Sequence, residues 1–430
     1  MSIIGIILFI LGLLIAVALH ELGHLIPAKL FGVKVSQYFV GFGPTIFSKV
    51  YRGTEYGVKW ILLGGYVRLC GMLAPARPGR KIFTKHGELT FAEQARRESA
   101  AELAPEEAAQ AFWRLSPGKK LIVMFGGPFV NFLLSVLCFA IVWLGIGMPA
   151  LSNTVGRIAP CIDPMQTKCE LAAATPAARS ELQQGDEIRA WAGTPVKDWQ
   201  ELREAIQAHG AGEKPVDVLR EGRQETFTIN VIEVERPQVR AGEIVKDTAG
   251  KPLLEMQPYL GVSPEIKREQ QSFSALPAQI GNLALGTAQI IIGLPVHLWN
   301  IGVSLFSDTP RDASGVVGLV GIADMAGKIT GGGSAQYTFA ARAADFLLLF
   351  ASLNMSLFIF NLLPLLPLDG GHILGALIEW IKRASAKWRG MPDPGAFDTA
   401  RLLPLSQVVV SFFVLMTIFL IVADILKPAF

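Results

Sequence analysis

Residues 20–24, His-Glu-Leu-Gly-His, directly follow an apolar run, residues 3–19, that contains no ionisable side chain. On a helix, His20 and His24 lie one turn apart on the same face, so both imidazoles can bind one zinc ion. Glu21 points about 100° away, where it can take a proton from a water molecule that the zinc activates. Charged groups inside a membrane-length segment are costly and usually mark a functional site. The sequence therefore predicts a catalytic zinc site inside a membrane.

The composition is typical of a membrane protein, because 51% of the 430 residues are hydrophobic and only 17% are charged. A helix needs about 20 apolar residues to cross the hydrocarbon core, and four stretches meet this requirement, at about 3–25, 121–150, 346–368 and 408–426. A fifth apolar stretch, 275–306, is interrupted by glycines and a proline, so we expect an amphipathic or interfacial segment there. No basic residue precedes the first stretch and no small-residue cleavage site follows it, which favours a retained span over a signal peptide. The net charge of +3 is too small to favour a nucleic acid as partner.

Basic residues set the expected orientation of the chain. The segment 26–120 contains 15 Lys and Arg against 7 Asp and Glu, and the segment between the last two spans is also basic. Cytoplasmic loops of membrane proteins carry such an excess of Lys and Arg. We therefore expect a multi-pass protein of the plasma (inner) membrane with both basic loops in the cytoplasm. Both termini and the long segment 151–345 then lie outside.

The predicted fold class is a polytopic α-helical membrane protein with four transmembrane helices, a β-hairpin region on the cytoplasmic side and one extracytoplasmic α+β domain. Alternating β-branched and aromatic residues with Gly-Gly and Gly-Pro dipeptides predict hairpins between residues 33 and 72. A polar insertion with a short helix is expected at 74–117. The predicted order is a first span at 1–27, a cytoplasmic loop at 28–117, a second span at 118–150, the outer domain at 151–264, an amphipathic or interfacial segment at 265–344, a third span at 345–380, a cytoplasmic loop at 381–404 and a fourth span at 405–427.

The outer domain is predicted from its turns and helix signals. A capped amphipathic helix is expected after Asp198, and a hairpin is expected around Glu221 and Gly222. Together with the turn at Gly185 and Asp186, these elements resemble a PDZ domain. The resemblance implies binding of extended peptides and peptide termini by strand addition. The alternative is a rigid outer cap without a ligand.

Four cysteines fall on two sides of the membrane in this topology. Cys161 and Cys169 lie in the outer domain, eight positions apart, in a compartment that permits oxidation. This pair is a candidate disulfide, and the alternative is two free thiols. Cys70 and Cys138 lie in the cytoplasmic loop and the second span, where we expect inert or buried thiols.

A catalytic zinc needs a third protein ligand and an open position for water. The strongest candidate is Asp369, which follows an apolar run with two prolines and precedes Gly370 and Gly371. Prolines and glycines break a helix, and broken backbone at membrane depth is tolerated only where it is buried in protein or lines a cavity. A buried structural carboxylate is the alternative for Asp369. His372 is either a neighbour of the metal site or a bystander.

Together these motifs resemble the site-2 protease family of intramembrane zinc metalloproteases, most closely its bacterial PDZ-containing, RseP-like members, and the paired outer cysteines point to the actinobacterial branch. The resemblance covers nearly the whole chain. Residues 20–24 match the HExxH motif, Leu-Asp-Gly at 368–370 matches the LDG motif, and Gly-Pro-Phe-Val-Asn at 127–131 matches the GxxxN element. Gly-Phe-Gly-Pro at 41–44 and Gly-Gly-Tyr-Val at 64–67 resemble the family's membrane-embedded β-hairpin region. The enterobacterial members have two PDZ domains where this chain shows one, so gating by tandem domains does not transfer.

The resemblance implies a role for each motif. His20, His24 and Asp369 would bind Zn2+, and Glu21 would act as general base and then as proton donor to the leaving amine. In the family, such asparagines and the hairpin lie near the substrate, so we expect substrate contacts from Asn361, Asn131, Gly64 and Gly65. For Asn131, a hydrogen bond that packs two helices is an equal alternative.

The expected function is regulated intramembrane proteolysis of single-pass membrane proteins, such as anti-sigma factors or signal-peptide remnants, that another protease has already trimmed. A transmembrane helix hides its peptide bonds, so the substrate has to unwind, and an edge strand near 58–68 would hold it extended. Membrane lipid is the other expected partner. Two rival functions are a non-catalytic, zinc-containing membrane PDZ receptor and a metal transporter. Glu21 argues against the receptor, because a structural zinc site needs no base, and the concentration of ionisable residues on two spans argues against the transporter.

Overall fold

A computed structural model describes residues 3–76, 79–163, 169–170, 173–240, 243–244, 253–307, 311, 316–331 and 338–428. The chain divides into two compact units. The first, Met1–Ile146 together with Gln271–Phe430, is called the membrane unit because it contains the long apolar helices. The second, Gly147–Gln270, is called the β-rich unit.

Among the described residues, five helical segments are long and apolar enough to cross a bilayer, against four predicted from the sequence. These helices fit an integral membrane protein with a β-sheet domain, and the count of four transmembrane helices stays a prediction. The helices are α1 (Ile3–Leu30), α3 (Pro117–Ala140) with a following π-helical turn to Ile146, α6 (Leu276–Ile292), α9 (Phe339–Asn361) and α11 (Leu403–Leu426).

The additional helix, α6, lies where the sequence predicts an interfacial segment, at 265–344. Two glycines inside α6 do not interrupt it, because a glycine in a helix costs only about 1 kcal/mol relative to alanine and α6 packs against α9. The helix ends at Gly293, and Pro295 stands in the first turn of the next helix, α7 (Leu294–Leu305). The helix is therefore broken where Gly293 and Pro295 occur close together, and it continues through the single glycines.

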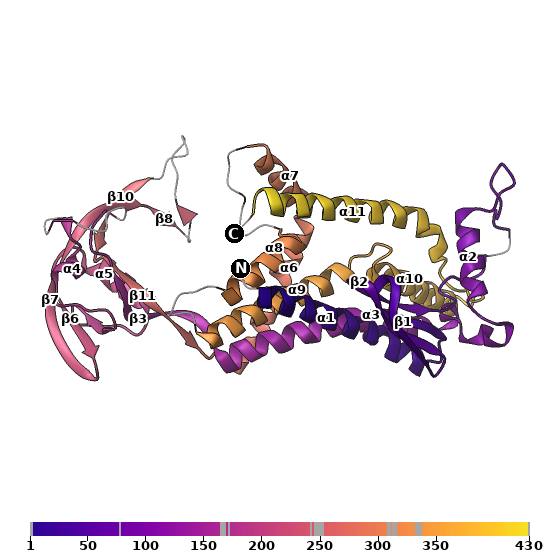
Figure 1. The fold of residues 1–430 in the computed structure, drawn as a ribbon, viewed down its shortest axis with the longest axis horizontal. Coiled ribbons are helices and arrows are strands. Elements are labelled where there is room, and N and C mark those ends of the chain that lie inside the picture. The colour runs from indigo at the N-terminus through magenta and orange to yellow at the C-terminus, as the bar shows by residue number, and fades with distance from the viewer. Residues whose placement is uncertain are drawn as a thin grey trace. The chain divides into compact units, whose positions relative to one another are not determined.

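Helix α3 packs lengthwise against both α1 and α9 (Figure 1). Small residues allow membrane helices to approach closely, and a Cβ added to Gly23 of α1 would meet the carbonyl oxygen of Gly126 of α3 at only 2.4 Å. On the α9 side, the hydroxyl of Ser135 donates a hydrogen bond to the carbonyl oxygen of Ala351 at 2.7 Å. Helix α3 is thus the shared neighbour of two long helices.

The third predicted span is broken near its prolines. Helix α9 ends at Asn361, and a new helix, α10 (Asp369–Trp388), begins at the candidate metal ligand. Helix α10 extends into 381–404, where the sequence predicts a loop, because no glycine or proline occurs between Gly375 and Gly390. Gly390 has a φ of 65°, a left-handed conformation that glycine adopts at little cost. The loop therefore starts later than predicted.

Helix α8 (Leu319–Gly331) packs against α1 and α11. Its N-terminal end is held by Asp424 of α11, whose carboxylate accepts a hydrogen bond from the backbone N–H of Gly321 at 2.8 Å. Arg311 donates to the same carboxylate at 2.8 Å, and both side chains are almost completely buried. This ion pair ties the chain before α8 to the end of α11.

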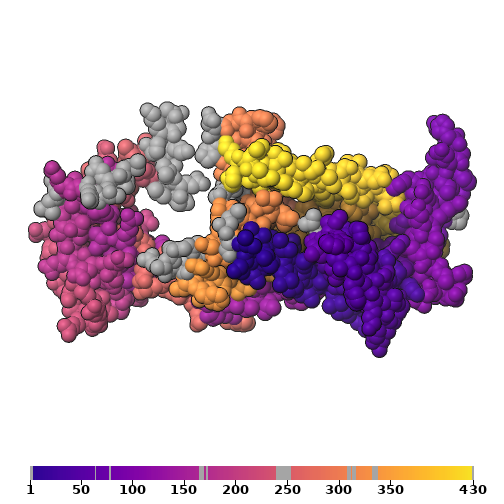
Figure 2. Space-filling view, in the orientation of Figure 1, coloured from indigo at the N-terminus to yellow at the C-terminus, as the bar shows by residue number. Residues whose placement is uncertain are grey.

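A β-hairpin forms within the region where the sequence predicts hairpins. Strand β1 (Val35–Tyr51) pairs antiparallel with β2 (Thr54–Leu69). The hairpin packs against α1 at the surface of the membrane unit (Figure 2). Many of its apolar side chains are exposed, including Phe47 at 65% and Trp60 at 69%. Apolar surface of this kind is typical of a contact with lipid or with another chain.

The polar insertion at 74–117 contains the short helix that the sequence predicts, α2 (Phe91–Ala101), and two 3-10 turns. The side chain of Thr90 caps α2. Arg96 donates hydrogen bonds to both carboxylate oxygens of Asp398, at 2.8 and 2.9 Å. This pair fastens the insertion to the segment that precedes α11.

The β-rich unit contains a seven-stranded antiparallel sheet of order β10-β7-β6-β4-β3-β11, with β5 paired to β4. As the sequence predicts, Asp198 caps a helix, and the β6–β7 hairpin turns at Glu221 and Gly222. The elements are β3 (Met148–Ile158), α4 (Pro176–Arg179), β4 (Glu187–Trp191), β5 (Thr194–Pro195), α5 (Trp199–His209), β6 (Gly212–Arg220), β7 (Arg223–Pro237), β10 (Leu254–Tyr259) and β11 (Val262–Glu269), with a separate ladder of β8 (Val239–Arg240) and β9 (Glu243–Ile244).

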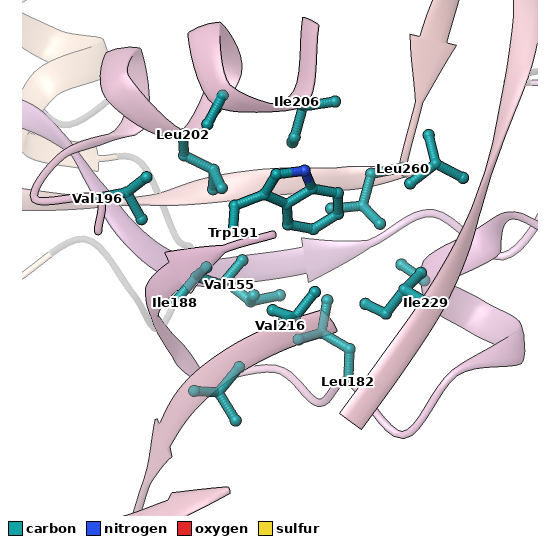
Figure 3. Close-up of a cluster of buried hydrophobic side chains, with 14 residues drawn as sticks. Val155, Leu182, Ile188, Trp191, Val196, Leu202, Ile206, Val216, Ile229 and Leu260 are labelled. Atoms are coloured by element: carbon teal, nitrogen blue, oxygen red, sulfur yellow. The ribbon is translucent and has the colours of Figure 1, made fainter. Parts of the chain in front are cut away.

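Trp191 lies at the centre of the core of the β-rich unit (Figure 3). Leu202 and Ile206 come from α5, and Ile188 and Val216 come from the sheet. All four side chains are buried together with the indole. Helix α5 therefore covers one face of the sheet.

The cysteines follow the division between the two units. Cys161 and Cys169 of the β-rich unit form a disulfide, with their Cα atoms 5.9 Å apart. Residues 164–168, inside this short loop, lie outside the described residues. Cys70 and Cys138 of the membrane unit are free and buried.

Asp186 and Arg220 form a second notable contact of the β-rich unit. The carboxylate of Asp186 accepts hydrogen bonds from the Arg220 guanidinium at 2.8 and 2.7 Å, and from the backbone N–H of Gln183 at 2.7 Å. Burial raises the pKa of Asp186, but the hydrogen bonds from Arg220 and Gln183 and the charge of Arg220 lower it by more. The pKa of this carboxyl group therefore lies below its ordinary value. The pair fixes the turn that follows Gly185 to strand β6.

We expect that replacing Asp186 by asparagine destabilises the β-rich unit by about 2–3 kcal/mol at neutral pH, because hydrogen bonds to charged groups contribute about 1.5–3 kcal/mol. A carboxylate with a lowered pKa stabilises the fold above the unfolded-state pKa of about 3.9, and this contribution is lost as the pH falls through the folded-state pKa. Urea unfolding of both proteins at about pH 7, 5 and 3 tests this. The difference in free energy of unfolding should be equal at the two higher pH values and smaller at the lowest. A difference that does not change with pH would contradict the prediction.

Candidate metal centre

Three side chains from two distant parts of the chain meet at one point in the membrane unit. His20 and His24 lie on consecutive turns of α1, and Asp369 is the first residue of α10. The His20 Nε2 and His24 Nε2 atoms are 3.3 Å apart, and each lies 3.4 Å from Asp369 Oδ2. His24 is only 4% exposed. The three residues therefore form a compact cluster that is largely shielded from solvent.

These distances fit a zinc ion. Zinc in proteins is tetrahedral, and its nitrogen and oxygen ligands lie about 2.0–2.1 Å away, which gives tetrahedron edges of about 3.3–3.4 Å. The two imidazole nitrogens and the carboxylate oxygen form a triangle with edges of 3.3, 3.4 and 3.4 Å. Two histidines and one acidic residue are also a ligand set that catalytic zinc sites use, with the fourth position left open. The residues present thus suit zinc in type, number and spacing.

A hydrogen bond to the backbone of α3 orients His24. Its Nδ1 lies 2.8 Å from the carbonyl oxygen of Val123, which can only accept, so Nδ1 carries the proton. The lone pair is then on Nε2, the atom that faces His20 and Asp369. Metal-binding histidines commonly donate their other ring nitrogen in this way. The Nδ1 atom of His20 is buried and has no hydrogen-bond partner within the described part of the chain.

Close contact between α1 and α3 leaves room for the His24 ring only because residue 127 is a glycine. A Cβ added to Gly127 would lie 2.1 Å from His24 Nε2. One residue earlier, Gly126 lies against the backbone of Gly23. The two helices therefore cross at small residues, and the crossing point is next to the proposed ligand atom.

The loop between α9 and α10 delivers Asp369 to the cluster. Its two prolines cannot donate backbone hydrogen bonds, so the helix cannot continue through residues 362–368. The start of α10 then packs onto this loop, because a Cβ added to Gly370 would lie 2.2 Å from the carbonyl oxygen of Leu363. The glycine after Asp369 is therefore required by close backbone packing.

Comparison with known proteins places the chain in a family. Residues 8–390 match the profile of Peptidase family M50. The chain belongs to Peptidase family M50. One relative is zinc metalloprotease Rip1 of Mycolicibacterium smegmatis, which is 31% identical over 444 residues that cover 99% of this chain and 98% of the relative. Another is zinc metalloprotease Rip1 of Mycobacterium tuberculosis (strain H37Rv), which is 30% identical over 100% of this chain and 98% of the relative. Metalloprotease MmpA of Caulobacter vibrioides is 28% identical, with coverage of 85% and 84%.

Family membership determines the class of reaction. As an M50 peptidase with several membrane-length helices, the protein is a zinc metalloendopeptidase of the site-2 protease type that cleaves within membranes. Its cofactor is Zn2+. Its substrates belong to the general class of membrane proteins. Both rival functions predicted from the sequence, a non-catalytic receptor and a transporter, are set aside by these relationships.

In this M50 peptidase, Glu21 lies beside strand β2 of the hairpin. Gly65 makes the approach possible, because an added Cβ would lie 2.9 Å from a methyl group of Val17 and 3.4 Å from Glu21 Cγ. The neighbouring Gly64 has a φ of 115° and lies near the ring of Phe42. The sequence predicts substrate contacts for both glycines, and the structure adds a second role for Gly65, which is close packing against the HExxH helix.

The two asparagines occupy different environments. Asn131 is 1% exposed and lies one helical turn after Gly127 on the buried face of α3. Its Oδ1 atom has no hydrogen-bond partner among the described residues. Asn361 is the last residue of α9 and is half-buried. His372, three residues after Asp369, lines a small cavity between α3 and α10.

Sequence reasoning missed the contacts that α3 makes around the cluster. The carbonyl of Val123 carries no signal in its side chain, so only the folded backbone reveals its role. Lys120 and Glu379 also went unrecognised, although a lysine at the start of one span and a glutamate on the helix after Asp369 are both unusual in apolar surroundings. In the structure their charged groups meet at 2.8 Å.

Proposed function

We propose that His20, His24 and Asp369 hold the zinc ion of this peptidase and that Glu21 is its general base. The observation that carries this assignment is the triangle of ligand atoms, whose edges of 3.3 and 3.4 Å equal those of tetrahedral zinc. Zinc bound there supplies a Lewis acid that polarises the scissile carbonyl group and acidifies a water molecule.

Glu21 performs the proton transfers in this proposal. Its carboxylate takes the proton of the attacking water and then gives it to the amine of the leaving peptide. The carboxamide oxygen of Asn131, which has no partner in the described part of the chain, suits a contact with a peptide N–H of the substrate. Asn361 is proposed to contact the substrate backbone from the end of α9.

We propose that the substrate binds next to the hairpin in extended form. Residues 65–68 of β2 pair on one side with residues 37–40 of β1, and among the described residues no strand pairs with their other side. An extended peptide can pair with such a free edge. Strand β2 passes Glu21 at Gly65. A segment held on this side of the hairpin would therefore bring its peptide bonds close to the base.

The proposed substrates are single-pass membrane proteins already trimmed by another protease, such as anti-sigma factors or signal-peptide remnants. We propose that the β-rich unit acts as a PDZ-like domain outside the cytoplasm, binds peptide termini and excludes untrimmed substrates. Its support is the helix-covered antiparallel sheet and the Gly185-Asp186 turn. In this proposal, both chain termini lie on the same side of the plasma membrane as this unit, and the basic loop at 28–117 lies in the cytoplasm.

The experiment that tests the assignment uses the full chain in detergent with a tagged single-pass substrate. We expect Glu21→Gln to lower the cleavage rate by about 10²–10⁴-fold, the usual contribution of a general base, and to retain one zinc per chain. A chelator should remove both zinc and activity from the unaltered protein. If Glu21→Gln cleaved at the rate of the unaltered protein, the proposed role of Glu21 would be refuted.

A further inference from the structure

One face of α3 connects the two helices that carry the candidate ligands. Lys120, Val123 and Gly127 follow each other at spacings of three and four residues, so they lie on the same side of the helix. Val123 and Gly127 contact His24 of α1. Lys120 reaches the other ligand-bearing helix, α10, where its Nζ lies 2.8 Å from Glu379 Oε2.

Glu379 is the centre of a buried charged cluster. Its side chain is 1% exposed, and that of Lys120 is 8% exposed. Oε2 also accepts a hydrogen bond from the backbone N–H of Phe397 at 3.0 Å, and Oε1 lies 3.0 Å from the guanidinium of Arg383. A buried carboxylate needs such compensation, because an unpaired charge at this depth is strongly destabilising. Glu379 can therefore sit at this place only while Lys120 and its other partners hold it there.

The cluster lies on the same face of α10 as the first residues of the helix. Asp369, His372 and Glu379 are separated by three and seven residues, which places them along one side of α10. Gly375 and Ala376, between them, are buried. Lys120, His372 and Glu379 line one small cavity of about 20 Å³, enough for about one water molecule. Asp369 begins α10 and the charged anchor Glu379 lies near its middle, so a shift of the anchor moves the helix that carries the ligand.

We propose that Lys120 and Glu379 form a positioning pair for the metal centre. The pair fixes α10 to α3, the helix that also holds His24, and so keeps Asp369 Oδ2 at the same 3.4 Å from both imidazole nitrogens. Neither residue touches the ligand atoms, so both act through the helices. The proposal rests on the ligand set given under the proposed function.

The test compares two matched substitutions in the full chain in detergent. Lys120→Met removes the cation from the proposed pair. Arg311→Met removes it from the pair with Asp424, which is buried to a similar degree and joins the chain before α8 to α11. Zinc affinity is measured by competition with a chromophoric chelator, and stability is measured by thermal unfolding. We expect both variants to unfold at lower temperature. Only Lys120→Met should raise the Kd for zinc, by about 10–100-fold, as seen for residues that support metal ligands, and Lys120→Arg should restore most of the affinity.

A double variant keeps the test informative if Lys120→Met does not fold. Lys120→Met combined with Glu379→Met removes both buried charges, which restores folding in comparable cases. The proposal expects this variant to bind zinc at least about tenfold more weakly than the unaltered protein. If either variant were destabilised but kept the original Kd for zinc and the original cleavage rate, the pair would be purely structural and the proposal would be overturned. Failure of the ligand set itself is distinguishable, because Asp369→Asn would then leave zinc binding unchanged.

Discussion

Replacing Gly127 by alanine is expected to abolish zinc binding and cleavage together. The added Cβ would lie 2.1 Å from His24 Nε2 and 2.7 Å from two ring carbons. The imidazole cannot turn away freely, since its Nδ1 is bound to the carbonyl of Val123. The helices cannot separate easily either, because the backbones at Gly23 and Gly126 are in contact. We expect the zinc affinity to fall by more than about 100-fold, the upper end of effects seen around metal ligands.

Gly118→Ala is the matched control for this substitution. Gly118 lies on the same helix, and no atom is found within 4 Å of the position that its Cβ would take. We expect this variant to keep zinc, cleavage and thermal stability, because alanine favours a helix more than glycine does. Elemental analysis of both purified variants, together with cleavage of a single-pass substrate, measures the effect. Zinc bound to Gly127→Ala with unchanged affinity would show that His24 is not held as the structure indicates.

The motifs with metal-binding or catalytic side chains could be predicted from the sequence, and the backbone contacts around them could not. The spacing of His20 and His24 predicts one face of a helix, and the prolines and glycines around Asp369 predict a break at its position. These signals depend on local geometry alone. The meeting of α1 with α10 depends on tertiary packing across more than 300 residues, so the sequence supports it only through resemblance to a family.

The sequence does not predict the unbroken length of α6 for a related reason. Glycines were given the same weight as proline in breaking the stretch at 275–306, whereas α6 continues through two of them. Inside an apolar helix that packs on a neighbour, the small cost of glycine is offset by the contact. The end of α10 shows the opposite case. Its polar second half resembles a loop in composition, but it contains no residue that stops a helix before Gly390.

Helix α3 joins the separate helices that carry the candidate ligands. It contacts α1 at Gly126 and Gly127, α9 at Ser135 and α10 at Lys120. Each contact is of a different type, either close glycine packing, a hydroxyl–carbonyl hydrogen bond or an ion pair. A catalytic site needs its groups held within about 0.5 Å of the productive geometry. A single helix that holds three neighbours meets this need with few residues.

Asp369→Asn is expected to remove zinc from the protein, in contrast to Glu21→Gln, which is expected to retain it. The carboxamide has nearly the shape of the carboxylate but no charge, so the ion would keep two neutral imidazoles and lose its only anionic ligand. We expect zinc binding to weaken by about 10³-fold, which corresponds to roughly 4 kcal/mol, and cleavage to fall below detection. Zinc content after dialysis against a chelator and cleavage of the single-pass substrate are measured on the same preparation.

A control substitution distinguishes a zinc ligand from a purely structural carboxylate at position 369. Asp393→Asn removes a carboxylate from the exposed loop after α10, where it lies 3.5 Å from Arg383 and is 62% exposed, and it should leave zinc and cleavage unchanged. A buried carboxylate that only stabilises the fold would, when replaced, lower the unfolding temperature and leave the Kd for zinc as it was. Asp369→Asn should instead raise the Kd for zinc, whatever it does to the unfolding temperature of the metal-free protein, because the carboxylate also pairs with both imidazoles there. The change in zinc affinity therefore identifies Asp369 as a ligand.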